Sequence, residues 1–298
     1  MPAQIDDDDA MFIEEQSVEA VQRERASQRG RAARVAVVMM QRDESALLDP
    51  WLRYHVDLFG AAGIVVLDNG STDRAVLARL ERAEAEGVRV IRDHARPEDA
   101  ARRGAIVTEV MQGLASEHDF LMPLDCAEFV AHQAPDGKIE CRADPVLNHL
   151  SKEHREEPGL LLTRGSYLNI PGLPGFYVFK NERRCFFAAG ALGSLGNGYH
   201  EGQTAAGGPE KRTAIIHFHY RFPPFERLTP EHRKALDAPP KDYAAEGLRG
   251  FRGAAAATGG SFATMDQAQY EGFFRRFDRV PLSPLRNALR RLGADLPW

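Results

Sequence analysis

The sequence predicts an α/β protein with a mainly parallel central sheet. Four short runs rich in apolar and β-branched residues are typical of buried strands. They span residues 35–40, 64–67, 88–91 and 120–124. Segments with helical spacing of apolar residues separate these runs, so each strand returns to the sheet through a crossover, and such crossovers produce parallel strands. The composition, 43% hydrophobic and 27% charged, is that of a globular chain.

The three crossovers each carry recognisable helix signals. Apolar residues recur at helical spacing over residues 44–59, with Pro50 inside the pattern. Either the first turn is separate from the rest, or the helix starts near Asp49, with Asp49 as its cap and Pro50 at its first position. Asp73, or a hydroxyl beside it, can cap a second helix over about 74–86. A third helix is expected over about 98–114. We therefore expect helices to cover the faces of the sheet.

The regular alternation stops after Asp125. A helix is expected over 144–154, and strands over 160–163, 176–179 and 213–220. The glycine-rich segment 190–208 is expected to form a loop. We therefore divide the chain into a flexible tail (1–33), one catalytic domain (34–225) and a helical C-terminal extension (226–298).

Composition argues against several classes of protein. Lys and Arg number 38 against 43 Asp and Glu, a net charge of −5, so a nucleic-acid binder is not expected. The three cysteines form no CxxC pair, which excludes a disulfide framework or zinc ribbon and suits a reducing, cytoplasmic location. The sequence has no apolar run of the ~18 residues that a spanning helix needs.

The C-terminal residues predict one amphipathic helix. Ser283 and Pro284 suit its start, and Gly293 suits its end. Its apolar face has two interpretations: it packs against the domain or a partner, or it binds the inner face of a membrane peripherally. That face consists of Leu285, Ala288, Leu289 and Leu292.

Polar clusters follow three of the predicted strands, at 41–44, 68–73 and 125–128. Parallel sheets bind their ligands at the carboxyl ends of the strands, so these clusters mark the candidate site. Asp68 can read a base or ribose, or simply hold a turn. Asp125 and Glu128 can hold a divalent cation on a diphosphate, or simply cap the next turn.

Two further groups are candidates for binding phosphate or metal. His217 and His219 share one face if they lie on a strand, and two imidazoles there can ligate a metal, contact phosphate or serve only the core. Arg103, beside Arg102 near the start of a predicted helix, can contact phosphate or remain solvated.

Taken in order, these segments resemble family 2-like glycosyltransferases of the GT-A fold, in particular a bacterial subgroup with a DxDEF-type motif. Residues 37–44 are similar to its first strand and "KNE" segment, with Asp43 in place of Asn, and residues 51–60 to its "EWLxYHxxLG" helix. Residues 64–73 resemble "IxxYDNxSTD", the most specific block. Residues 120–129 resemble "WLxxLDxDEF", and residues 217–220 the later histidine-tyrosine block. The resemblance covers close to two thirds of the chain.

The resemblance implies an enzyme that transfers a sugar from a nucleotide-sugar, in particular a UDP-sugar, to a hydroxyl of a glycan, lipid-linked or protein acceptor with inversion. It implies Mn²⁺ or Mg²⁺ on the diphosphate, with Asp125 as a ligand, and a carboxylate that deprotonates the acceptor. Asp125 and Glu128 are the catalytic candidates. The residues assigned to the nucleotide-sugar are Arg42, Glu44, Asp68, Asn69 and Arg103.

One departure from the family affects the metal site. Ala127 stands where the motif has its second aspartate. Either Glu128 supplies the missing oxygen, or His217 or His219 supplies a ligand, or the site works without metal or is inactive. Cys126 is a further substitute to test. The alternative function is a pseudoenzyme that binds nucleotide-sugar or glycan without turnover. A dinucleotide-binding enzyme is disfavoured because no GxGxxG follows the first strand.

Overall fold

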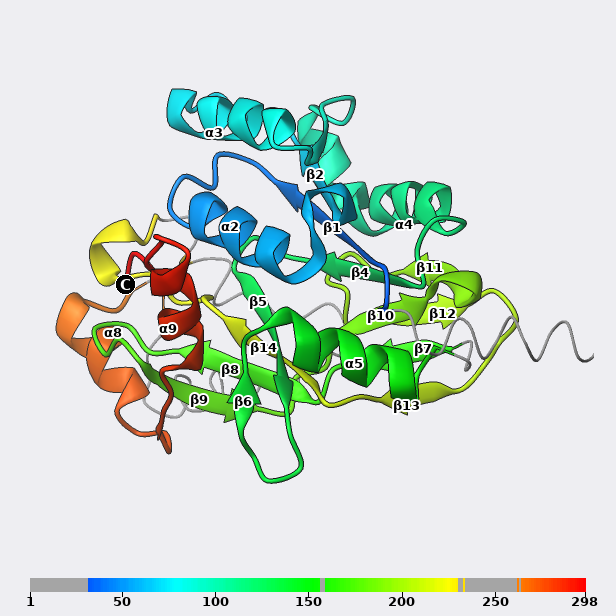
Figure 1. Cartoon of the computed structure of the whole chain (residues 1–298). Helices are drawn as coiled ribbons and strands as arrows, with labels where there is room; N and C mark the ends of the chain where they lie inside the picture. Colours follow the sequence, from blue (N-terminus) through cyan, green and yellow to red (C-terminus); the bar gives the residue numbers. More distant parts are fainter. Residues whose placement is uncertain (1–31, 156–158, 230–232, 234–261, 263) are drawn as a thin grey trace, which may run out of the picture.

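The structure is a computed structural model of the whole chain, and it describes residues 32–155, 159–229, 233, 262 and 264–298. Most of the predicted tail, residues 1–33, lies outside these ranges. The architecture is an α/β sheet flanked by helices with a second sheet beside it (Figure 1). The predicted α/β class with a mainly parallel central sheet is confirmed.

The central sheet has the strand order β13-β7-β10-β4-β1-β2-β3. The half that comes first in the sequence consists of β1 (Val35–Gln41), β2 (Ile64–Asp68), β3 (Arg89–Ile91) and β4 (Phe120–Leu124), all parallel. Its second half adds β7 (Leu160–Leu162), β10 (Cys185–Ala188) and β13 (Glu210–Arg212). β10 runs antiparallel to both β4 and β7. The sheet is therefore parallel where the predicted crossovers connect it and mixed beyond β4.

Side-chain alternation along β1 explains why helices cover both faces of this sheet. Val35, Val37 and Met39 face the core that contains α2 (Leu48–Phe59) and α3 (Arg74–Ala85). The intervening residues face a separate core with α4 (Arg103–Leu114). Every residue of β1 is buried, as expected for a central parallel strand.

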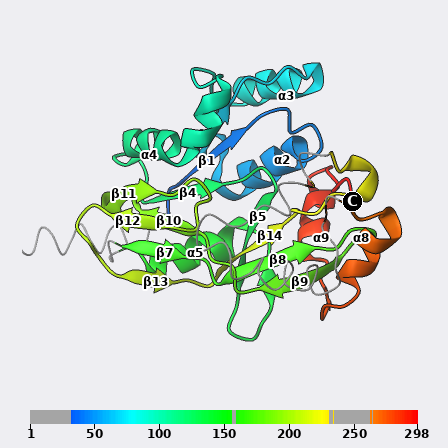
Figure 2. The same ribbon diagram turned by 180° about the vertical axis from the view of Figure 1, so that it is seen from behind.

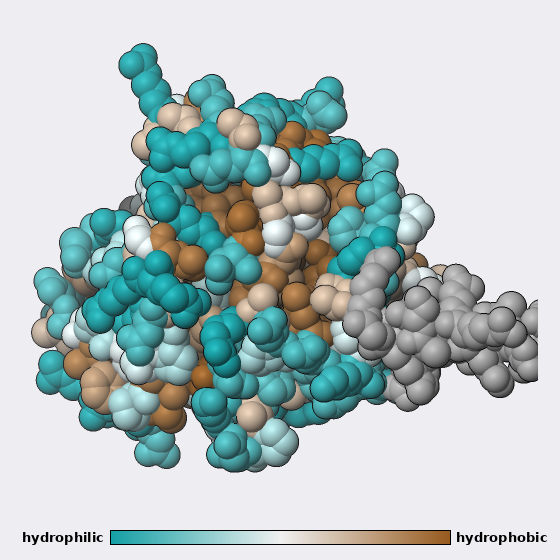
Figure 3. Space-filling model, in the orientation of Figure 1, coloured by the Kyte–Doolittle hydropathy of each residue, from teal (hydrophilic) through white to brown (hydrophobic). Residues whose placement is uncertain are grey.

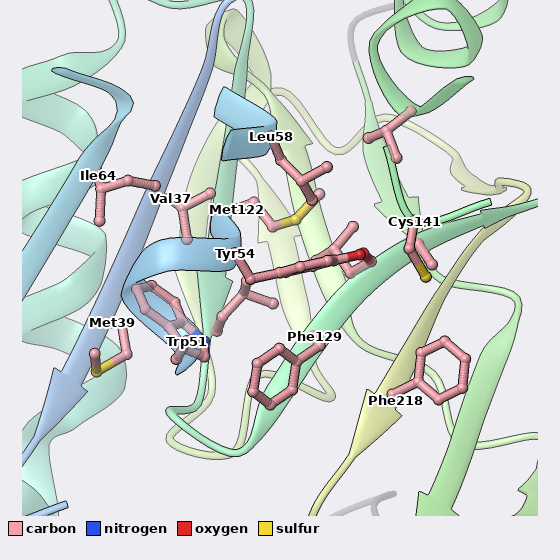
Figure 4. Close-up of a cluster of buried hydrophobic side chains, with 14 of the residues drawn as sticks. Val37, Met39, Trp51, Tyr54, Leu58, Ile64, Met122, Phe129, Cys141 and Phe218 are labelled. Carbon is pink, nitrogen blue, oxygen red and sulfur yellow. The ribbon is translucent and has the colours of Figure 1, made fainter. Parts of the chain in front are cut away.

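Helix α2 joins the central sheet to the second sheet. Figure 4 shows Trp51 and Tyr54 of α2 between Val37 and Met39 of β1 on one side and Phe129 on the other. The Tyr54 hydroxyl donates to the carbonyl of Val130 at 2.7 Å. Burial of these aromatic side chains, each contributing on the order of 2 kcal/mol or more, fixes one sheet against the other.

The second sheet has the order β15-β9-β8-β14-β5-β6. Its strands are β5 (Glu128–Gln133), β6 (Ile139–Glu140), β8 (Gly165–Asn169), β9 (Phe176–Lys180), β14 (Ile215–His219) and β15 (Val280–Pro281). β14 runs antiparallel to β5, and the register places His219 opposite Glu128. This pairing brings the histidine-containing strand to the acidic motif.

The described part of the C-terminal region packs onto the sheets. Helix α8 (Gln267–Phe274) and helix α9 (Pro284–Arg291) lie at the same end of the molecule in both views (Figures 1 and 2). The predicted apolar face of α9 is buried: Leu285 and Leu289 belong to the core beside α2. The face is therefore not available to a membrane. None of the helices among the described residues is both long and apolar enough to cross a bilayer.

Four local predictions are corrected by the structure. Helix α2 begins at Leu48 with Leu47 as its N-cap, so Asp49 does not cap it and Pro50 is not at its first position. The expected third helix divides into a 3-10 segment, Pro97–Arg102, and α4. The expected loop 190–208 contains β11 (Leu192–Leu195) and β12 (Gly202–Thr204). Ser283 stands at the N-cap of α9 without a capping hydrogen bond from its side chain.

The remaining helices follow their predicted signals. Asp73 caps α3 by accepting from the amide of Ala75 at 2.7 Å. Helix α5 (Ala143–Glu153) covers β5. Figure 3 shows hydrophilic side chains over α3, and hydrophobic side chains in the middle of the same face, around α2.

Candidate functional site

A cleft of about 630 Å³ lies beyond the carboxyl ends of β1 and β4. Its volume falls within the range of about 300–1,000 Å³ that is usual for small-molecule sites. β1 and β4 are adjacent and parallel, so the segments that follow them meet at one edge of the sheet. Six charged residues line the cleft: Asp43, Glu44, Arg103, Asp125, Arg221 and Arg227. The sequence prediction of a site at this edge agrees with the position of the cleft.

Asp125 stands at the wall of the cleft with a guanidinium near each carboxylate oxygen. Arg103 Nη1 donates to Asp125 Oδ1 at 2.7 Å, and Arg184 Nη2 lies 3.5 Å from Asp125 Oδ2. Although burial works in the opposite direction, the positive charges of Arg103 and Arg184 lower the pKa of Asp125. Asp125 is therefore an anion at neutral pH and is already neutralised by the protein.

Arg103 is fixed by three sets of contacts. Besides Asp125, its Nε and Nη2 donate to the carbonyl of Asn197 at 3.0 and 2.7 Å, and its guanidinium lies 4.8 Å from the ring centroid of Tyr199. Nearby Asp125 raises the pKa of Arg103. These contacts use three of the five N–H groups of the guanidinium, so two further hydrogen bonds can be made toward the cleft.

Behind Asp125 lies a buried charge cluster centred on Arg184. Arg184 Nε donates to Glu128 Oε1 at 2.5 Å, and Arg184 Nη1 contacts the carbonyl of Gly198 and His200 Nε2. The carboxylate of Glu182 lies 3.6 Å from His200 Nε2. Arg184 is 2% exposed and Glu128 0%. Arg184 thus serves as counterion to carboxylates in the interior.

Glu128, a predicted catalytic residue, is hidden from the cleft. Its side chain accepts from the amide of Asp125 at 3.0 Å and does not line the cavity. Burial, partly offset by Arg184, raises the pKa of Glu128 to about 7. Full burial prevents it from touching an acceptor, so its role in this structure is to position Asp125 and Arg184.

The two histidines predicted as metal ligands differ in whether they reach the cleft. His219 lines the cleft, with its Nδ1 3.8 Å from Glu128 Oε1. His217 lies deeper on β14 and does not line the cleft. Burial lowers the pKa of His217 to about 3 and that of His219 well below its usual value. Both imidazoles are neutral at physiological pH.

The predicted nucleotide residues after β2 hold turns. Asp68 Oδ1 accepts from Gln41 Nε2 at 2.9 Å and from the hydroxyl of Ser71 at 2.5 Å. Asn69 Nδ2 donates to the carbonyls of His94 and Arg96 at 2.6 and 2.9 Å. Both side chains are 4% exposed and neither lines the cleft. The structure therefore does not bring Asp68 and Asn69 into the same cavity as Asp125.

The segment after β1 holds two residues that the sequence assigned to the nucleotide-sugar, and one of them lines the cleft. Glu44 is exposed and lines the cleft, whereas Arg42 is exposed outside it. Cys126 also lines the cleft, but burial raises the pKa of its thiol well above the usual value. Sulfur is a soft ligand, whereas Mg²⁺ and Mn²⁺ favour oxygen, so Cys126 does not replace the missing aspartate.

Asp43 ties this segment to the next loop. Its carboxylate accepts from the amides of Thr72 and Asp73 at 2.7 and 2.8 Å, and these bonds lower the pKa of Asp43. Its backbone has φ +53°, a left-handed conformation that Asp and Asn adopt more readily than most residues. Asn, the residue that the resembled motif has at this position, would tolerate the same conformation.

The side chains at Asp125 do not form a fitting site for a divalent cation. Mg²⁺ and Mn²⁺ favour several oxygen ligands. Here Ala127 offers no side-chain oxygen, Glu128 bonds to Arg184, and both oxygens of Asp125 face guanidinium groups. Among the residues that the structure describes, one group of three metal-ligating side chains lies close together, and it is away from Asp125.

That other group consists of His149, Glu153 and His154 at the end of α5. His149 Nε2 accepts from the amide of Ala214 at 3.0 Å, so its proton is on Nδ1, which faces Glu153 Oε1 at 3.2 Å. A metal on Nδ1 would require a proton on Nε2 and would break the bond from Ala214. The group is therefore a contact between His149 and Glu153, with the ring of His154 beside it.

A second cavity, of about 320 Å³, lies between α2 and α3 away from the strand ends. Arg79 and Arg53 pair there with Asp49, and the rest of the lining includes apolar residues of both helices. It has the character of a packing groove.

Sequence reasoning missed Arg184, Arg221 and Arg227. Arg184 directly precedes β10, a strand that the hydrophobic pattern did not reveal because Cys185–Ala188 is short and precedes the glycine-rich segment. Arg221 follows the predicted histidine strand, where a search for cationic residues after strand ends would have found it. Arg227 stacks over Trp298 at 5.4 Å, a contact between distant residues that no local pattern indicates.

No family model matches this chain, and no curated protein matches it. Among solved structures, the chain is similar to a protein described as "Crystal Structure of a Mycobacterial Protein", with 20% identity and a TM-score of 0.29. The match covers 50% of this chain and 44% of that one, so the chain spans less than half of that protein's length. At this level of similarity, neither fold nor function follows for this chain.

Proposed function

We propose that this protein is a glycosyltransferase that binds a nucleotide-sugar, in particular a UDP-sugar, in the cleft beside Asp125. The observation that carries the proposal is the position of Asp125 and Arg103 on the wall of a 630 Å³ cleft at the carboxyl ends of parallel strands. This is the edge at which α/β sheets bind nucleotides. The ordered resemblance of five sequence blocks to family 2-like glycosyltransferases supports the same function.

The charges of the cleft suit a diphosphate leaving group. Arg103, Arg221 and Arg227 line it, and guanidinium groups bind phosphate oxygens with two parallel hydrogen bonds. Fixed cations of this kind stabilise the negative charge that develops on the nucleotide diphosphate as the bond to the sugar breaks.

Glu44 is the side chain in the best place to deprotonate an acceptor hydroxyl. It is exposed and lines the cleft, whereas Glu128 is inaccessible. An inverting displacement needs such a base on the face of the sugar opposite the leaving group. The acceptor remains a glycan, lipid-linked or protein hydroxyl.

Incubation with a panel of nucleotide-sugars, followed by measurement of nucleotide release and sugar transfer, tests the proposal. We expect turnover with one donor, and a loss of roughly hundredfold in kcat for Glu44→Gln with nucleotide affinity retained. Asp125→Ala should abolish turnover, whereas Asp119→Asn, at the opposite end of β4, should retain it. Absence of both nucleotide binding and turnover across the panel would exclude the function.

A non-catalytic sugar- or nucleotide-binding protein is the second candidate. Ala127 and the inaccessible Glu128 favour it, because two carboxylates of the resembled motif are then missing from the cleft. Saturable donor binding without turnover would select this function. A clear rate of transfer by the unmodified protein excludes it.

A further inference from the structure

Two guanidinium groups lie beside Asp125, the residue that the resemblance to family 2-like glycosyltransferases makes a metal ligand. Arg103 faces Asp125 Oδ1 and Arg184 faces Asp125 Oδ2. A cation that uses Asp125 as a ligand must either displace one of them or share a carboxylate oxygen with it at close range, against the repulsion between like charges. Displacement is unfavourable as well, because each guanidinium is held by further partners.

Arg184 is the harder of the two to displace. It is 2% exposed and bonded to Glu128, which is 0% exposed. Removing its charge would leave a carboxylate buried without a counterion, which is strongly unfavourable. Arg184 is therefore a permanent positive charge behind the cleft wall.

The position of this charge affects how the cleft wall presents Asp125. Three side-chain carboxylates and three guanidiniums line the cleft. Behind the wall, Arg184 pairs with Glu128 and also lies 3.5 Å from Asp125 Oδ2. Asp43 meanwhile directs its carboxylate to the amides of Thr72 and Asp73. An anion in the cleft thus meets Arg103, Arg221 and Arg227, while the carboxylates of Asp125 and Asp43 are already held by partners in the protein.

We propose that Arg184, acting through Asp125 and Arg103, replaces the divalent cation, so that the cleft binds a nucleoside diphosphate without metal. Asp125 holds one edge of the Arg103 guanidinium, and the two N–H groups not used by Asp125 and Asn197 contact the diphosphate oxygens. The inference rests on the proposed function, which it deepens by naming how the diphosphate is recognised.

Calorimetric titration of the full chain with UDP and with inorganic pyrophosphate, in EDTA and then in excess Mn²⁺, tests the inference. We expect Mn²⁺ to give no tighter dissociation constant than EDTA, because Mn²⁺ in solution binds the diphosphate itself and competes with the site, and we expect no heat from Mn²⁺ titrated alone. Tightening by roughly tenfold or more in Mn²⁺, or Mn²⁺ binding that Asp125→Asn removes, would overturn the inference while leaving the proposed function intact.

A variant of Arg103 tests which residue binds the diphosphate, because Arg103 lines the cleft. Arg103→Gln should weaken pyrophosphate binding roughly tenfold in EDTA, whereas the adjacent Arg102→Gln, equal in charge but exposed outside the cleft, should change it less than twofold. Equal losses in the two variants would indicate a general charge effect and reject the inference. If neither UDP nor pyrophosphate binds in either buffer, both the inference and the proposed function fail. Metal-independent UDP binding without turnover would uphold the inference alone.

Discussion

Arg184 and Glu128 form a fully buried ion pair, with Nε 2.5 Å from Oε1, directly behind Asp125. Both residues also contact Asp125: Glu128 accepts from its amide, and Arg184 lies 3.5 Å from its carboxylate. The position of Asp125 at the cleft wall therefore depends on a pair that is itself inaccessible to any ligand.

Arg184→Met should destabilise the protein by about 3–5 kcal/mol, because Glu128 would remain as a buried charge without its partner. Adding Glu128→Gln to Arg184→Met should recover part of the loss, since the second change removes the uncompensated charge. Urea denaturation of the two single variants and the double variant at neutral pH measures this coupling.

The adjacent Arg183→Gln is the control for this experiment. Arg183 pairs with Glu210 at 3.1 Å, with both side chains at least one-third exposed, so the loss should stay within about 1 kcal/mol. If Arg184→Met costs no more than Arg183→Gln, the buried pair does not have the role given to it here.

Acid should destabilise the protein through its buried neutral histidines. Burial lowers the pKa of His55 and His217 to about 3 and that of His200 to about 2, and lowers that of His219 strongly. The unfolded chain binds these protons below about pH 6.5, while the folded chain does not. Stability is therefore present above the unfolded pKa and falls as the pH is lowered through it.

Glu128 has the opposite effect on the pH dependence of stability. Its folded pKa of about 7 exceeds the unfolded value of 4.5, so its contribution is complete below about pH 4.5 and is lost as the pH rises through about 7. Four histidines outweigh one carboxyl. We expect unfolding free energies, measured in urea between about pH 7 and pH 5, to fall by several kcal/mol, at roughly 1 kcal/mol per pH unit for each net proton.

The variant His217→Leu tests the contribution of one histidine to this pH dependence. Neither ring nitrogen of His217 has a hydrogen-bond partner in the described part of the chain, so leucine should maintain or raise stability at neutral pH. The pH dependence should become shallower by about one proton. A large loss of stability at neutral pH, or an unchanged slope, would contradict the assignment of His217 as a neutral core residue.

The part of the site that sequence predicts is the part built from contiguous segments. Val35–Gln41 and Phe120–Leu124 are mainly apolar runs that are followed by polar residues, and the parallel topology then places Glu44 and Asp125 at one edge. The same signals misplace Asp68 and Asn69, because a residue after a strand can point into its own turn as well as into a cleft. Local pattern does not distinguish these directions.

Arg184 shows why the rest of the site could not be predicted. Its partners, Glu128 and His200, lie on β5 and after β11, and strand pairings between distant segments, such as that of β10 with β4, bring the three together. A buried arginine has the same sequence signature as an exposed one, since the chain around it has no periodicity that shows burial. Ala127, in place of the second aspartate of the motif that the sequence resembles, is visible in the sequence, whereas the guanidinium groups around Asp125 are not.

Asp43→Ala should destabilise the protein by about 2–3 kcal/mol. It removes an anionic acceptor from the amides of Thr72 and Asp73, and it places alanine at φ +53°. Asp43→Asn retains an acceptor oxygen and tolerates this backbone, so it should cost about 1 kcal/mol or less. Thermal denaturation of both variants checks the order. Equal losses would mean that the carboxylate charge, rather than the turn, is what matters.

Ala127→Asp should convert the cleft toward metal dependence. Ala127 lines the cleft two residues after Asp125, so an aspartate there adds a second carboxylate and a negative charge to the wall. In EDTA, repulsion between this charge and the diphosphate should weaken UDP binding several-fold, because like charges in a partly buried site interact strongly. In Mn²⁺, two carboxylates can share the cation, and the affinity should recover.

Ala127→Asn is the matched control, because it has the shape of aspartate without its charge. Its UDP affinity should be no higher in Mn²⁺ than in EDTA, since an amide oxygen alone does not offset the guanidiniums of Arg103 and Arg184. Titration calorimetry of both variants separates charge from steric effects. If Ala127→Asp binds UDP in EDTA as tightly as the unmodified protein, the substituted position lies away from the diphosphate. The assignment of this wall to the leaving group would then be wrong.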